Sequence, residues 1–65
     1  MDAKKLAQFE EELIENGSAD FFESHKKYGY DILKYLFSIG KIRFNANPKE
    51  SVIMITPSER LLKEE

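Results

Sequence analysis

Cations are the side chains of this sequence with the clearest chemical potential, because they are concentrated in one stretch. Residues 25–49 contain a single acid, Asp31, and six basic residues: Lys26, Lys27, Lys34, Lys41, Arg43 and Lys49. Residues 1–24 carry two lysines against seven carboxylates, and residues 50–65 carry two cations against four carboxylates. A local basic field attracts polyanions even though the whole chain has a net charge of −2. The alternative is that these charges only solvate different faces of a small protein.

Catalytic and metal-binding chemistry has few candidate residues. His25 is the only histidine, and the chain has no cysteine. The run Glu10–Glu12 cannot aim three carboxylates at one metal ion, because consecutive helical residues diverge by about 100°. The serines lack a nearby base, and no glycine-rich loop of the phosphate-cradling kind occurs. We therefore expect a protein that is not an enzyme and that holds no metal and no cofactor.

Length and composition limit the architecture that can position these side chains. The 65 residues suffice for one domain, residues 1–65, and a hydrophobic content of 42% is too high for a chain disordered by composition. Without cysteine, the fold must be stabilised by packing or by pairing with another copy. No apolar run reaches the roughly 18 residues of a membrane span, and the acidic start does not resemble a signal peptide. We expect a cytoplasmic protein that does not enter a membrane.

Two helices are predicted in the first part of the chain. The first runs from Ala3 to about Asn16, capped by Asp2 and ended by Asn16-Gly17, with the apolar stripe Leu6, Phe9, Leu13 and Ile14. The second covers Ala19 to roughly Lys27, capped by Ser18, with Phe21 and Phe22 on its buried side.

A third helix of about ten residues begins after Gly29 and is followed by a hairpin. Its apolar stripe is Ile32, Leu33, Leu36 and Phe37, and Gly40 ends it in a left-handed conformation. Two helices joined by a tight turn, here Tyr28-Gly29-Tyr30, form a helix-turn-helix. Next, Ile42 and Phe44 alternate with polar residues, which predicts a strand. The loop Asn45–Ser51 should form a flexible polar tip. Val52–Ile55 is predicted to be a second strand that is apolar on both faces.

The end of the chain carries a capping signal. Thr56-Pro57-Ser58-Glu59 has Thr at N-cap, Pro at N1 and Glu at N3, which predicts a capping box. The helix would run from Pro57 to about Lys63 and bury Leu61 and Leu62, while the tail Lys63-Glu64-Glu65 would fray. The predicted fold is therefore α+β, with three helices, a β-hairpin and a short C-terminal helix.

Two segments together resemble a known family. Leu36–Ile42 shows the step Leu-x-x-x-Gly-x-Ile, and Ile55–Leu62 reads Ile-Thr-Pro-Ser-Glu-Arg-Leu-Leu after a polar-tipped hairpin. This resembles the recognition helix, wing and following helix of MarR-like winged helix-turn-helix transcription regulators, over roughly residues 18–62. The resemblance implies a winged helix that places its third helix in the major groove of double-stranded DNA and its wing along the backbone or in the minor groove.

The resemblance also implies the residues that contact DNA. Tyr30, Lys34 and Ser38 would lie on the exposed side of the third helix. The remaining candidates lie near the helix-turn-helix turn and on the wing: Lys26, Lys27, Lys41, Arg43, Asn47 and Lys49. Arg43 is the only arginine among them, so phosphate contacts would dominate and binding would be salt-sensitive. A homodimer formed through the first or last helix would double these contacts.

A second hypothesis is a protein-interaction module or small inhibitor of the same shape. Its partner would meet the acidic first helix or the apolar edge of Val52–Ile55. The charge segregation favours the DNA-binding hypothesis, while the scarcity of base-reading side chains keeps this alternative open.

Overall fold

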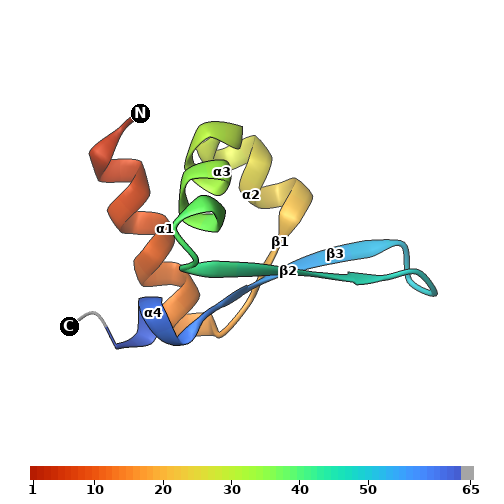
Figure 1. The fold of residues 1–65 in the computed structure, drawn as a ribbon. Helices are drawn as coiled ribbons and strands as arrows, with labels where there is room; N and C mark the ends of the chain where they lie inside the picture. The colour runs from red at the N-terminus through yellow and green to blue at the C-terminus, as the bar shows by residue number, and fades with distance from the viewer. Residues whose placement is uncertain (64–65) are drawn as a thin grey trace.

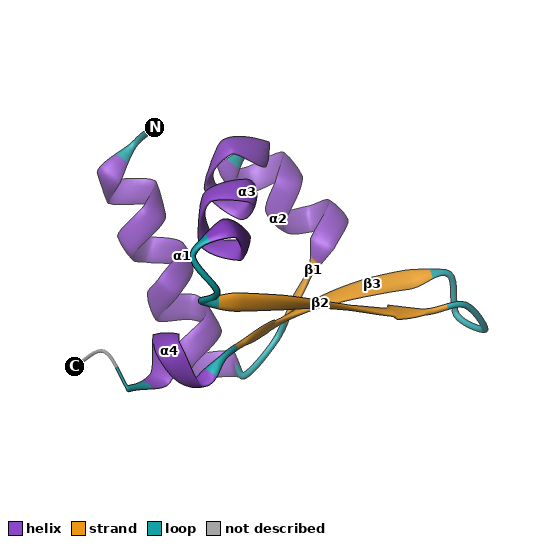
Figure 2. Ribbon diagram, viewed as in Figure 1, coloured by secondary structure: helices purple, strands orange, loops and turns teal. Residues whose placement is uncertain are grey.

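The computed structural model describes residues 1–63, which form four helices and three strands (Figures 1 and 2). In chain order these are α1 (Ala3–Asn16), β1 (Ala19–Asp20), α2 (Phe21–Tyr28), α3 (Tyr30–Ser38), β2 (Ile42–Asn47), β3 (Val52–Pro57) and α4 (Glu59–Leu62). The helices gather at one end, and the β2–β3 hairpin projects from them (Figure 1). The predicted fraying of the C-terminal tail concerns Glu64 and Glu65, which lie outside the described residues.

The three strands form one antiparallel sheet in the order β1-β3-β2. Hairpin pairing runs from Ile42 opposite Pro57 to Asn47 opposite Val52, and β1 adds two pairs on the other side of β3. The α+β class, with a helix-turn-helix followed by a hairpin and a short helix, is confirmed in this winged-helix arrangement. The strand β1 was not predicted.

The hairpin is longer than its sequence indicated. Asn45 pairs with Met54, and the Asn45 Nδ2 atom donates a hydrogen bond of 3.0 Å to Thr56 Oγ1. The prediction of a flexible polar loop over residues 45–51 is therefore wrong, because residues 45–47 pair with Val52–Met54 of the partner strand. The turn is confined to Pro48–Ser51, with Ser51 at a φ of +55°. The wing is consequently a paired ribbon almost to its tip.

The first helix has the predicted bounds and caps. The Asp2 carboxylate accepts the N–H of Lys4 at 2.9 Å, and Gly17 adopts a φ of +80° while its N–H bonds the Leu13 carbonyl. Phe9 and Leu13 are fully buried. Ile14, predicted to be buried, is exposed, since it lies beyond the edge of the packed stripe.

The second helix begins two residues later than predicted. Ser18 is not its cap, because Ala19 and Asp20 extend to pair with β3. The Asp20 carboxylate instead accepts the N–H of Glu23 at 2.9 Å. The buried residues of α2 are Ser24 and Tyr28, so the predicted burial of Phe22 is wrong.

The third helix begins directly after Gly29, which has a φ of +92°. Ile32, Leu33 and Leu36 are buried as predicted. Phe37 is exposed, contrary to the predicted stripe, and its ring stacks on Phe44 of β2 at 4.8 Å between centroids.

The predicted capping box does not form. Pro57 is the last residue of β3, and Thr56 pairs with Arg43 across the hairpin, so sheet pairing holds both residues outside the helix. The N-cap of α4 is Ser58, whose Oγ donates to the Gly40 carbonyl at 2.5 Å and whose N–H donates to the Lys41 carbonyl at 2.8 Å. Leu61 is buried as predicted, whereas Leu62 is half exposed.

The core collects side chains from every helix and from both strands of the hairpin. Its buried apolar members are Phe9, Leu13, Tyr28, Ile32, Leu33, Leu36, Ile42, Ile55 and Leu61. Because α3 uses one face for this core, its other face is open to solvent beside the projecting hairpin.

Candidate nucleic-acid interface

The outer face of α3 presents the side chains that the sequence predicted. Tyr30, Lys34 and Ser38 follow one another at intervals of four residues, which places them on one side of the helix, and all three are exposed. The Ser38 hydroxyl donates to the Tyr35 carbonyl at 2.7 Å. Lys34 has no hydrogen-bond or ion-pair partner among residues 1–63, so its ammonium group is open to a ligand.

A shallow hollow of about 440 Å³ lies at the C-terminal end of α3. It is lined by Phe37, Ser38, Ile39, Gly40, Arg43, Ser58, Glu59 and Arg60. The Nη1 atom of Arg60 donates to the Ile39 carbonyl at 2.8 Å, which ties α4 to the end of α3. Arg43 is exposed and has no such partner within the described part of the chain. Two guanidinium groups therefore border one hollow beside the recognition-type helix.

The wing tip carries Asn47 and Lys49. The Asn47 Oδ1 atom accepts the Lys49 N–H at 3.1 Å, which fixes the turn and leaves the lysine ammonium exposed. Lys49 and Arg43 thus place one cation near each end of the ribbon.

Two of the predicted DNA-binding lysines form ion pairs with α1. The Lys27 Nζ atom lies 2.7 Å from Glu12, and the Lys41 Nζ atom lies 3.2 Å from Glu10. Both pairs join the basic segment to the acidic helix α1. The hydrogen bond from Lys27 is the main reason that the pKa of Glu12 is below its usual 4.5, and the same bond raises the pKa of Lys27 above 10.5. These lysines neutralise part of the acidic charge of α1.

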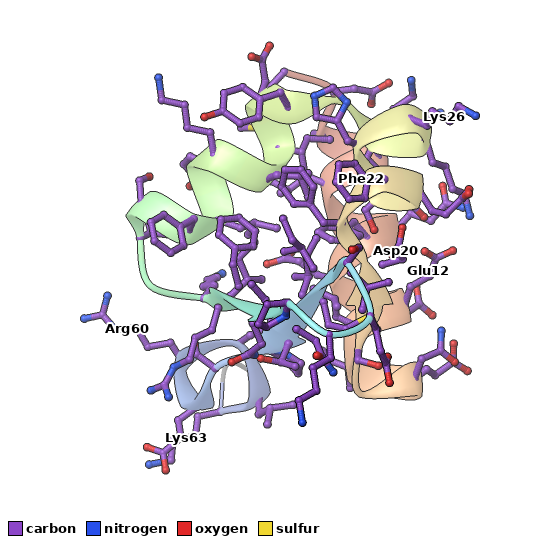
Figure 3. The ribbon with its side chains drawn as sticks, turned by 90° about the vertical axis from the view of Figure 1, so that its right-hand side faces the viewer. Glu12, Asp20, Phe22, Lys26, Arg60 and Lys63 are labelled. Atoms are coloured by element: carbon purple, nitrogen blue, oxygen red, sulfur yellow. The ribbon has the colours of Figure 1, made fainter. Side chains whose placement is uncertain are left out.

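Lys26 is exposed but lies apart from the arginine hollow. Figure 3 looks onto the end from which the hairpin projects, and it shows Lys26 on α2 and Arg60 on α4 at opposite sides of the view. The structure therefore places Arg43 and the additional residue Arg60 at one hollow, Lys34 on the exposed face of α3, and Lys26 at the far margin. Sequence reasoning missed Arg60 because its contact with the end of α3 spans 21 residues, which no local pattern indicates.

A connected group of aromatic rings crosses the same end of the molecule. We define the aromatic belt as Phe37, Phe44, Phe21, Phe22, His25 and Tyr30. Its neighbouring centroids lie 4.8 to 6.1 Å apart. Three of its rings are largely in solvent: Phe22 is 57%, Tyr30 54% and Phe37 53% exposed. Sequence reasoning assigned the phenylalanines of α2 and α3 to the core, so this surface was not predicted.

Tyr28 on α2 carries a hydroxyl group that is buried among the helices. Tyr28 is only 7% exposed, and its hydroxyl lies near Glu12 and Lys27 without making a hydrogen bond of good geometry in the described chain. Burial is the main reason that its pKa is raised above 10.0. The ring packs on Phe9 at 4.9 Å, so this tyrosine serves the core and stands outside the candidate interface.

No protein-family model matches the chain, and no curated protein or solved structure matches it. Among residues 1–63, the helices are all too short or too polar to cross a membrane.

Proposed function

We propose that the chain binds double-stranded DNA in the manner of the MarR-like regulators that its sequence resembles. The exposed face of α3 would enter the major groove, and the β2–β3 wing would follow the backbone. The observation that supports this most directly is the set of exposed cations, Lys34, Arg43 and Lys49, which lack partners in residues 1–63 and occupy α3 and the wing. The cations that face α1 are neutralised instead.

The exposed side chains also indicate how contacts would divide between DNA bases and phosphates. Arginine is the side chain that most often reads guanine, but Arg43 is the only arginine among the predicted contacts and lies on the wing strand β2 beside the end of α3, so we assign it a phosphate contact. The rest of the surface offers lysines, which contact phosphates without reading sequence. We therefore infer affinity that is dominated by the backbone and falls steeply with salt.

Fluorescence anisotropy of a labelled duplex at low salt tests this proposal. Each of Lys34→Ala, Arg43→Ala and Lys49→Ala should weaken binding by about fivefold to tenfold, the effect of removing one phosphate contact. Lys5→Ala is the matched control, because Lys5 is an exposed lysine of α1. Absence of binding by the unaltered protein at low salt, or an equal loss in the control, would exclude the proposed surface.

The alternative hypothesis of a protein-interaction module keeps only part of the surfaces on which it was based. β1 covers the edge of β3 at Met54 and Ile55, whereas the edge beside Val52 and Ile53 stays unpaired within residues 1–63. In the acidic helix, Glu10 and Glu12 are already engaged by lysines of the same chain. We therefore carry the DNA-binding proposal forward.

A further inference from the structure

The aromatic belt has a feature that intact duplex DNA would not use. Its exposed rings are flat apolar surfaces, and exposed apolar patches of this kind usually mark a binding site. In a duplex the base faces are stacked on one another, so they cannot accept these rings. A single-stranded segment offers its base faces freely, and stacking on protein aromatics is its common mode of recognition.

Each exposed ring of the belt has a cation beside it. Lys26 follows Phe22 by four residues on α2, and Lys34 follows Tyr30 by four residues on α3, so each pair shares one helix face. The third ring, Phe37, borders the same hollow as Arg43. The surface therefore alternates apolar rings with positive charges, and two carboxylates border it, Glu23 beside Phe22 and Glu59 beside Phe37.

This alternation matches the chemistry of an unpaired strand, in which flat bases alternate with phosphates. Aromatic and arginine side chains are also enriched in protein–protein interfaces, but lysine is depleted from them, so Lys26 and Lys34 favour the nucleic-acid strand over a protein partner. The ring geometry is also suitable. Phe37 stacks on Phe44 with an interplanar angle of 17°, and with one face covered in this way the exposed part of the ring is free to receive a base.

We propose that the aromatic belt stacks unpaired bases while Lys26, Lys34 and Arg43 contact the neighbouring phosphates. This inference rests on the proposed function and narrows its ligand to duplex DNA that carries a single-stranded extension. The duplex part lies against α3 and the wing, and the extension crosses from Phe37 toward Phe22 on α2, the residue labelled in Figure 3.

A comparison of two labelled DNAs tests the inference: a blunt duplex, and the same duplex with a single-stranded extension of about ten nucleotides. The unaltered protein should bind the extended DNA at least about fivefold more tightly, the lower limit for stacking one base. Phe22→Ala and Phe37→Leu should remove this preference while binding to the blunt duplex persists. The leucine keeps an apolar contact with Phe44, and circular dichroism confirms that each variant folds.

Tyr35→Ala is the matched control, because Tyr35 is 42% exposed on the same helix and belongs to no ring contact of the belt. The Tyr35→Ala variant should keep the preference for the extended DNA over the blunt duplex. Equal affinity of the unaltered protein for the two DNAs would overturn the inference and leave duplex binding intact. Retained preference in the phenylalanine variants, or its loss in the control, would also overturn it. If neither DNA binds, the proposed function fails first and the inference fails with it.

Discussion

The salt dependence of DNA binding can be calculated from the cations that the fold leaves unpaired. Lys34, Arg43 and Lys49 are exposed on α3 and the wing, and none has an ion-pair partner among residues 1–63. If all three contact phosphates, log K should fall with log salt at a slope of about −2.7. A rise from about 50 mM to 200 mM salt would then weaken binding roughly 40-fold.

The perturbation is Arg43→Ala, which removes one of the three contacts. Its slope should fall to about −1.8, and the same rise in salt should weaken binding only roughly 12-fold. Anisotropy titrations at four or more salt concentrations measure both slopes, and Lys5→Ala on α1 should keep the slope of the unaltered protein. An unchanged slope in the Arg43 variant would refute the phosphate contact, and a slope near zero in the unaltered protein would refute the whole calculation.

Three further predictions concern the stability of the fold and use denaturant or thermal unfolding. Ser58→Ala should lower the free energy of unfolding by about 1 kcal/mol, because it removes a buried hydrogen bond to the Gly40 carbonyl. Thr56→Ala should lower the free energy of unfolding by less. A larger loss for Thr56→Ala than for Ser58→Ala would indicate that Thr56 is the helix cap. Tyr28→Phe should leave stability unchanged or raise it by about 1 kcal/mol, equivalent to about 4–8 °C in Tm, because the hydroxyl makes no hydrogen bond of good geometry in the described chain. A clear loss would show that this hydroxyl is bonded. Because the pKa of Glu12 is lowered in the fold, its stabilising effect is complete above pH 4.5 and is lost as the pH falls through its folded value. Glu12→Gln should therefore reduce the acid-induced loss of stability, and an identical pH profile would contradict the ion pair.

Local signals in the sequence were sufficient for much of the fold. Asp2 and Gly17 bound the first helix because their capping interactions involve only neighbouring residues. The period change after Gly40 correctly indicated a helix followed by a hairpin. Thr56-Pro57 wrongly predicted a helix start, because the same residues also suit the end of a strand. Their pairing with β2 is a long-range contact that a local motif does not indicate.

The candidate site was predictable only where exposure follows helix periodicity. Tyr30 and Lys34 lie on the outer face of α3 because the opposite face is apolar. The ion pairs of Lys27 and Lys41 span 15 and 31 residues, so no local spacing rule could identify them. Phe37 has the spacing of a core residue, but its ring stacks on Phe44 of β2 at the margin of the core and stays 53% exposed.

The central claim is that α3 and the β2–β3 wing form the DNA-binding surface, and amide chemical-shift mapping tests it most directly. Blunt double-stranded DNA is added to isotope-labelled protein at low salt. The account predicts that the largest shifts fall in residues 30–38 and 42–52, with small shifts in residues 3–16. Shifts concentrated in α1, or no shifts anywhere, would contradict it.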